Sequence, residues 1–234
     1  MSMNYDRSAA AHEVAAASGA FLSRVYAWMC GALLITAIVS VYVAMNGSLI
    51  HMVMDTRAVF IGLLVAEFGL VVLLSALIGR MPYVLAMAVF VLYAALNGMT
   101  LSVIFMAYTA SSVGTAFFVT AGTFGAMSLY GYVTKRDLTT VGSLCFMALI
   151  GLILASVVNL FLGNETVYWI TTYAGILIFV GLTAYDTQKI KQMNVAGMED
   201  SEFARKAAIL GALTLYLDFI NLFLMILRIF GRRR

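Results

Sequence analysis

Residues 204–230 read ARKAAILGALTLYLDFINLFLMILRIF, and between positions 207 and 227 the only formal charge is Asp218. A helix needs about 20 mostly apolar residues to cross the hydrocarbon core of a bilayer. The stretch is long enough, so it predicts a membrane-spanning helix. At 1.5 Å per residue, Asp218 would lie about 20 Å along this helix, deep in the bilayer.

The few polar positions of this stretch follow a helical spacing. They are Gly211, Thr214, Asp218 and Asn221. Intervals of three and four residues place them on one face of a helix. Because the helix is apolar on its other sides, we expect it to be central in a bundle, with the polar stripe facing the interior.

The rest of the chain has the same character. Its 234 residues are 63% hydrophobic and 11% charged, whereas a soluble domain carries about 25% charged residues. This composition excludes a soluble enzyme, a disordered chain and a disulfide scaffold, and the formal net charge of +3 is too small to predict nucleic-acid binding. Cys30 and Cys145 lie singly in apolar blocks, so the sequence predicts no disulfide, no cofactor and no Cys/His metal centre.

Seven apolar blocks are long enough to span a bilayer. They cover residues 21–45, 58–79, 82–108, 113–133, 138–162, 167–187 and 204–230. The alternating pattern of β-barrel strands is absent, so helices are predicted. The expected fold is an all-α membrane protein, a seven-transmembrane helix bundle with the last helix central. Residues 1–20 are predicted to form a cytoplasmic N-terminal arm, 21–230 the transmembrane domain and 231–234 a basic tail.

Basic residues set the expected orientation. Nine of the 14 Lys and Arg residues lie on the side of the N-terminus: Arg7, Arg24, Arg80, Lys135, Arg136, Lys189, Lys191, Arg205 and Lys206. The positive-inside rule therefore predicts a cytoplasmic N-terminus and an external C-terminus. Most of the remaining basic residues lie at the very end of the chain, which leaves open a last segment that turns back within the membrane and returns the tail to the inside.

Three carboxylates lie within the blocks, namely Glu67, Asp186 and Asp218. A charge at mid-membrane costs roughly 2.5 to 3.5 kcal/mol on insertion scales, so such groups tend to face a bundle interior and to mark ion or proton paths. The structural alternatives are a protonated Asp218 that serves packing alone and an interfacial Asp186 beside Lys189. In upright helices Asp218 would lie about 10 Å deeper than Asp186, so contact between them requires tilt or an inward extension of the sixth helix. Two roles stay open for Arg80, reaching Asp186 or extending to the interface.

Other polar and small residues in the blocks are expected to serve packing. Asn97 and Asn159 are predicted to hydrogen-bond across helices, and pairs such as Ala121 with Gly125 are predicted to let helices approach closely. No internal repeat is visible, so an inverted-repeat transporter is not predicted.

Two stretches of the sequence resemble the Bax inhibitor family, in its short prokaryotic branch. They are GLTAYD at 181–186 and LYLDFINLF at 215–223, and the similarity extends over all seven blocks. The resemblance implies a seven-helix bundle in which the last helix is surrounded by the other six. It also implies a multi-pass protein of the bacterial inner membrane.

The resemblance carries an expected activity, because bacterial members of this family are described as pH-sensitive calcium leak channels. It implies that Asp186 and Asp218 form a hydrogen-bonded pair that senses pH. It further implies that the second helix contributes Glu67 and an Arg linked to the pair. Arg80 lies about two positions later than that pattern expects.

The chemistry of such a pair follows from the residues themselves. Two carboxylates in contact at low dielectric cannot both ionise, so they share a proton that holds their helices together. Loss of that proton leaves two like charges that repel. Calcium takes six to eight oxygen ligands, so we expect only weak, transient metal binding at Asp186 and Asp218. The residues predicted to support the ion path or the gate are Glu67, Thr214, Asn221 and Arg80.

Enzymatic alternatives fail on the sequence. An intramembrane aspartyl protease also uses two apposed carboxylates, but it has Gly-x-Gly-Asp where this chain has LYLD at 215–218, and its Pro-Ala-Leu motif is absent because Pro82 is the only proline. A retinal protein needs a lysine in the last span, and residues 207–234 contain none. His12 and His51 both lie outside the blocks, so no serine in a span has a histidine partner. This argues against an intramembrane serine protease. No enzyme is expected.

The remaining alternative is a non-conducting regulator that binds other membrane proteins, because members of the family are also linked to stress protection and membrane-protein quality control. Its working surfaces would be the basic loop at 189–206 and the alanine-rich arm. The expected partners are the lipid bilayer and the calcium ion, joined by membrane proteins if the chain is a regulator, with no nucleic acid.

Overall fold

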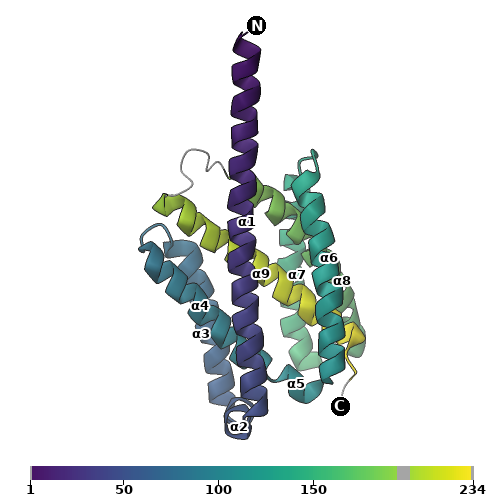
Figure 1. Ribbon diagram of the computed structural model, residues 1–234. Helices are drawn as coiled ribbons and strands as arrows, with labels where there is room; N and C mark the ends of the chain where they lie inside the picture. Colours follow the sequence, from purple (N-terminus) through teal and green to yellow (C-terminus); the bar gives the residue numbers. More distant parts are fainter. Residues whose placement is uncertain (1, 194–200, 233–234) are drawn as a thin grey trace. The chain divides into compact units, whose positions relative to one another are not determined.

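The computed structural model describes residues 2–193 and 201–232. Within these ranges the chain is helical, with no β-strand element (Figure 1). The helices are α1 Ser2–Met45, α2 Gly47–Asp55, α3 Arg57–Leu77, α4 Tyr83–Leu101, α5 Ile104–Ala107, α6 Ala110–Val133, α7 Thr139–Leu162, α8 Glu165–Lys191 and α9 Glu202–Phe230.

Seven of these described segments are long and apolar enough to cross a membrane, which confirms the seven predicted blocks. They are Ala16–Met45, Arg57–Leu77, Tyr83–Ala107, Ala110–Val133, Thr139–Leu162, Glu165–Lys191 and Glu202–Phe230. The chain is thus an all-α, multi-pass membrane protein. The segment predicted as an N-terminal arm forms the first part of α1, which begins at Ser2. Of the predicted basic tail, the last two arginines lie outside the described residues.

Two features of the helices were not predicted. The short helix α2 follows the first span, where Asn46 caps it by accepting a hydrogen bond from the Leu49 N–H at 3.4 Å. The third block is divided between α4 and α5, because Ser102 ends α4 and its hydroxyl donates to the Met99 carbonyl at 2.6 Å. Helices α2 and α5 are each too short to span a bilayer.

The chain divides into two compact units. Unit 1 comprises Met1–Phe105 and Ile190–Thr214, and unit 2 comprises Met106–Lys189 and Leu215–Arg234. The helix α9 therefore contributes its first half to unit 1 and its second half to unit 2.

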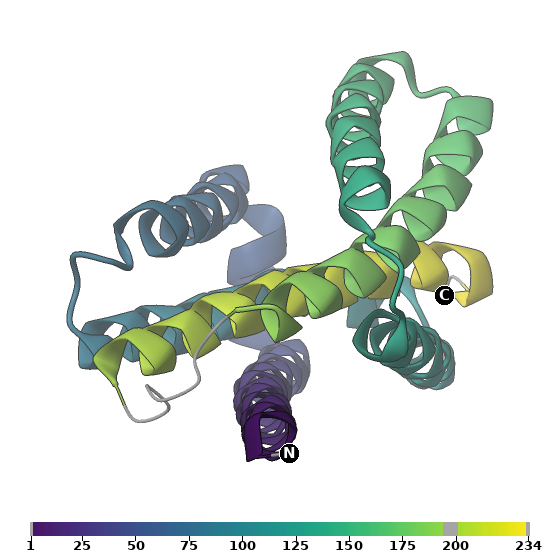
Figure 2. The same ribbon diagram turned by 90° about the horizontal axis from the view of Figure 1, so that it is seen from above.

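In unit 1, α1 packs closely against α4. The Thr36 hydroxyl donates to the Ala94 carbonyl at 2.8 Å. Gly98 lies against the backbone of Thr36, where a Cβ would come 2.7 Å from the Thr36 carbonyl oxygen. The helices α3 and α4 of this unit lie side by side (Figure 2).

The start of α9 holds the turn that precedes α4, also within unit 1. Pro82 is the N-cap residue of α4 and has no side chain that could cap it. Glu202 supplies the acceptor instead, because its Oε1 receives the Tyr83 N–H at 3.2 Å, and Lys206 Nζ donates to the Met81 carbonyl at 3.2 Å. One unmet donor at the start of α4 is thus satisfied from another helix.

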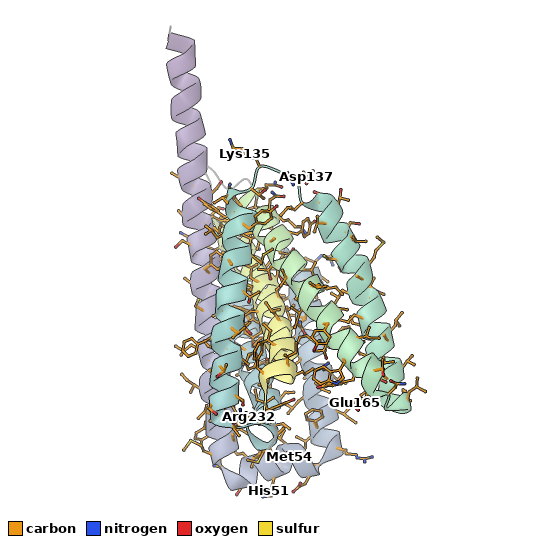
Figure 3. All side chains as sticks on the ribbon, turned by 90° about the vertical axis from the view of Figure 1, so that its right-hand side faces the viewer. His51, Met54, Lys135, Asp137, Glu165 and Arg232 are labelled. Carbon is orange, nitrogen blue, oxygen red and sulfur yellow. The ribbon has the colours of Figure 1, made fainter. Side chains whose placement is uncertain are left out.

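In unit 2, the aromatic ring of Phe219 joins α9 to α6. It makes edge contacts with the rings of Phe117 and Phe124, at centroid distances of 5.6 and 5.4 Å. Lys135 and Asp137 lie at one end of this unit and Glu165 and Arg232 at the other (Figure 3).

The end of α9 is bonded to the start of α6. The Thr109 N–H donates to the Arg232 carbonyl at 3.3 Å, and the Arg232 N–H donates to the Ser112 hydroxyl at 3.0 Å. Because α9 is a single uninterrupted helix from Glu202 to Phe230, the alternative of a last segment that turns back within the membrane is wrong.

Burial differs among the spanning helices. In the apolar window of α9, 67% of the residues are buried, compared with 44% in α8 and 6% in α7. The exposed apolar side chains of a weakly buried span such as α7 are those that lipid tails would cover. The central position of the last helix stays a prediction.

Candidate functional site

The site is a pair of buried carboxyl groups on α8 and α9 in unit 2. Asp186 is 9% exposed and Asp218 is 5% exposed, and their side chains are hydrogen-bonded to each other. The depth argument from the sequence left their contact open. The helix α8 continues four residues beyond the predicted block, to Lys191.

A hydrogen bond between two carboxyl groups requires that one of them carry a proton, because an ionised carboxylate is only an acceptor. The second oxygen of Asp218, Oδ2, is buried and has no hydrogen-bond partner among the described residues. Buried polar atoms are normally bonded, so this oxygen is available to a proton, a water or a cation. Lys189 lies one helical turn after Asp186, and its charge acts on that residue.

The turns of α8 around Asp186 are held by α6, α7 and the loop between them. Gly131 of α6 lies against the Ala184 backbone, and Gly142 of α7 lies against the Tyr185 ring. Gln188 hydrogen-bonds to the loop at residues 134–138. The sequence analysis missed these contacts, although glycines at helix ends and an amide two residues after Asp186 were visible signals.

Glu67 forms a second buried site, on α3 in unit 1. Its side chain is 8% exposed. Asn97 Nδ2 of α4 donates to Glu67 Oε2 at 3.1 Å, and the Thr100 hydroxyl donates to Oε1. The predicted cross-helix hydrogen bond of Asn97 is confirmed, and the Glu67 carboxyl group accepts from two donors on α4.

Two predictions about packing are wrong. Among the described residues Asn159 bonds to no other spanning helix, and its Oδ1 accepts the Asn164 N–H at 2.9 Å in the turn after its own helix. Gly125 mediates no close approach with Ala121, since no described atom beyond its own helix lies within 4 Å of a Cβ built there. The close approaches in unit 2 lie at glycines that the spacing pattern did not single out.

The structure places the other predicted site residues as follows. The Thr214 hydroxyl donates to the Leu210 carbonyl at 3.1 Å, and Asn221 Nδ2 donates to the Leu217 carbonyl at 2.8 Å. Both side chains thus bond the preceding turn of α9, and their part in an ion path stays a prediction. Arg80 is exposed in the turn after α3, as expected for a basic residue at an interface.

A metal centre of the usual kind is not formed by the described residues. Within the described ranges, no group of three or more His, Cys, Asp or Glu side chains is arranged to hold a metal ion. The Asp186 and Asp218 carboxyl groups alone offer four oxygens, fewer than the six to eight ligands that calcium takes.

Similar chains occur in several bacteria. The family model described as inhibitor of apoptosis-promoting Bax1 matches residues 19–234. The inner membrane protein YbhL of Escherichia coli is 53% identical over 215 residues, which cover 92% of each chain. Uncharacterized proteins of Borreliella burgdorferi and Rickettsia prowazekii are 42% and 43% identical over 214 residues, covering 92% of this chain and 92% and 90% of theirs. The similarity therefore includes every spanning helix.

Proposed function

This chain belongs to the Bax inhibitor family, and from that premise we propose that it is a pH-sensitive calcium leak channel of the bacterial inner membrane, gated by Asp186 and Asp218. The inner-membrane location of the similar protein YbhL supports the proposed location. The excess of Lys and Arg on one side supports a cytoplasmic N-terminus.

The observation that carries the proposal is the hydrogen bond between the two buried carboxyl groups. A proton shared between them links α8 to α9 within unit 2. When that proton leaves, two like charges remain in contact at low dielectric, and they repel. The gate therefore closes when the proton is shared and opens when it is lost.

The free oxygen of Asp218 supports passage of a cation. Oδ2 is buried and unpaired among the described residues, so a passing ion finds an acceptor that costs no existing hydrogen bond. Glu67 supplies a second buried carboxylate in unit 1, already held in place by Asn97 and Thr100. Conduction requires sites that bind weakly enough to release the ion, and single carboxylates meet that requirement.

The test is calcium flux into liposomes that contain the purified protein, measured from pH 5 to 8. The leak is expected to rise with pH in the wild type and to lose this dependence in Asp218→Asn, which can donate a hydrogen bond without titrating. Asp55→Asn is the matched control, because Asp55 is exposed and paired with His51. Flux no higher than in empty liposomes at every pH would contradict the proposed channel activity.

In that case the non-conducting regulator remains. Its proposed surfaces are the N-terminal arm and the basic loop at 189–206, of which residues 194–200 lie outside the described residues. We propose no enzymatic role for the aspartate pair. Cleavage of a membrane-anchored substrate that disappears in Asp218→Asn would contradict this.

A further inference from the structure

Gln188 is buried, with 6% of its surface exposed, and uses both ends of its amide on one loop. Its Oε1 accepts the Leu138 N–H at 2.9 Å, and its Nε2 donates to the Arg136 carbonyl at 2.8 Å. Both partners belong to the loop between α6 and α7. An amide that is satisfied at both ends in a buried site fixes the distance between the two backbones that it joins.

Two close approaches reinforce this attachment. A Cβ added at Gly131 of α6 would come 2.2 Å from the Ala184 carbonyl oxygen, and one added at Gly142 of α7 would come 2.4 Å from the Tyr185 ring. The two helices that flank the loop therefore touch α8 just before Asp186, and Gln188 touches the loop just after it.

The position of Gln188 on α8 gives this attachment a direction. Residues two apart in an α-helix are separated by about 200° around its axis. Asp186 bonds Asp218 of α9, so Gln188 bonds the loop from the opposite side of the same turn. A shift of the loop relative to α8 would therefore change where the Asp186 carboxyl group lies.

We propose that Gln188 is a positioning residue for the carboxyl pair, which holds Asp186 against Asp218 by anchoring this turn of α8 to the loop at 134–138. The inference rests on the proposed gate, but it concerns how the pair keeps its proton and can be tested without transport. The other titratable or charged side chains that these elements carry in the same turns are Tyr130, Tyr132, Lys135, Arg136, Asp137, Cys145, Tyr185, Lys189, Lys191 and Tyr216.

The test is infrared titration of the purified protein. The carbonyl band of a protonated carboxyl group is followed against pH, and Asp218→Asn identifies the part of the band that belongs to the pair. Gln188→Met keeps the length of the side chain and removes both hydrogen bonds. Its pair is expected to lose the proton at a pH lower by about half a unit, or about threefold weaker proton binding.

The matched control is Gln192→Met, the same substitution at an exposed position one turn later. An unchanged midpoint in Gln188→Met would overturn the proposal, as would an equal shift in the control. Faster hydrogen exchange at the Leu138 amide in Gln188→Met alone would show that the anchor was removed. If Gln188→Met does not fold, Gln188→Asn keeps the amide but is one methylene shorter, and the same shift is expected.

Transport distinguishes this inference from the proposed function. A wild type without calcium leak would contradict the channel, whereas the infrared midpoint of Gln188→Met would still decide whether Gln188 positions the pair. Where the leak is present, its pH midpoint is expected to shift with the infrared midpoint in Gln188→Met. In Gln192→Met both midpoints are expected to stay at the wild-type value.

Discussion

Gly131 lies directly against the backbone of Ala184, so that a Cβ added to this glycine would come 2.2 Å from the Ala184 carbonyl oxygen. Since backbone atoms cannot move aside as a flexible side chain does, Gly131→Ala must push α6 away from α8. Overpacking of this kind costs about 1 to 3 kcal/mol. We expect a lower midpoint of thermal unfolding in detergent, with a weaker attachment of the turns that carry Asp186.

Gly125→Ala on the same helix is the control for this change. No described atom beyond its own helix lies within 4 Å of a Cβ at Gly125, and alanine is favoured over glycine in a helix by roughly 0.5 to 1 kcal/mol. Gly125→Ala is therefore expected to leave the protein as stable as the wild type or slightly more so. Equal midpoints for the two variants would contradict the close approach at Gly131.

Glu67 and Asn97 are expected to be energetically coupled. Asn97→Leu removes a donor from a buried carboxylate, which costs about 1 to 3 kcal/mol of unfolding free energy. Asn97 makes at least one further interaction, so the single variant alone cannot measure the pair. The double variant with Glu67→Leu is expected to lose less unfolding free energy than the sum of the losses in the two single variants, because both polar partners are gone.

The measurement is a double-mutant cycle by unfolding in mixed detergent. Asn159→Leu combined with Glu67→Leu is the reference cycle, since Asn159 bonds the turn after its own helix. The reference losses should add to within about 0.5 kcal/mol. Additivity of Glu67→Leu with Asn97→Leu would show that their hydrogen bond contributes nothing.

The sequence predicted the spanning helices well because their signal is local. About 20 consecutive apolar residues are enough to identify a span. Five blocks differ from the described helix by only a few residues at their ends, whereas α1 begins well before the first block and the third block is divided between α4 and α5. Helix α2 was missed because nine residues are too few for this signal. The break at Ser102 was missed because it depends on a hydroxyl that bonds the preceding turn, and many serines in spans do not end a helix.

The carboxyl pair was predictable in its residues, but its contact followed only from the resemblance to the family and not from the spacing of the residues. Charge is scarce in the spans, so Asp186 and Asp218 were conspicuous, whereas the distance between them depends on helix tilt that no local pattern encodes. The contacts of Gln188 and Gly131 were missed for the same reason. They join segments about 50 residues apart, and only the tertiary structure shows which glycine faces another backbone.

Asp137 lies in the loop between α6 and α7, outside the spanning segments. The Thr139 side chain and then its backbone N–H, which donates to Asp137 Oδ1 at 2.8 Å, lower the pKa of Asp137 below its ordinary value of 3.8. Since the folded pKa is depressed, these hydrogen bonds contribute stability at pH values above the unfolded pKa. That contribution is lost as the pH falls through the folded pKa.

A carbon NMR titration of labelled aspartate can check this. Thr139→Ala removes the side-chain donor but keeps the N–H, so the pKa of Asp137 should rise part of the way to its ordinary value. Thr140→Ala, one residue later in α7, should leave it unchanged. A pKa of Asp137 at its ordinary value in the wild type would contradict the hydrogen bonds.

Asp186 and Asp218 make the stability of the protein depend on pH in a defined direction. Near neutral pH an unfolded chain ionises both carboxyl groups, whose ordinary pKa is about 3.9, whereas the hydrogen bond between the two groups requires the folded pair to hold one proton. The folded state then binds more protons than the unfolded state, so stability falls as pH rises, by up to about 1.4 kcal/mol per pH unit. The fall ends once the folded pair has lost its proton.

Unfolding in detergent at a series of pH values measures this slope. Contributions from other titrating groups cancel when variants are compared with the wild type at each pH. Asp218→Asn should flatten the slope, because the amide donates to Asp186 without a titrating proton. Asp55→Asn changes an exposed carboxylate and should keep the slope. If the slopes of Asp218→Asn and the wild type are equal, the two carboxyl groups share no proton in the folded protein.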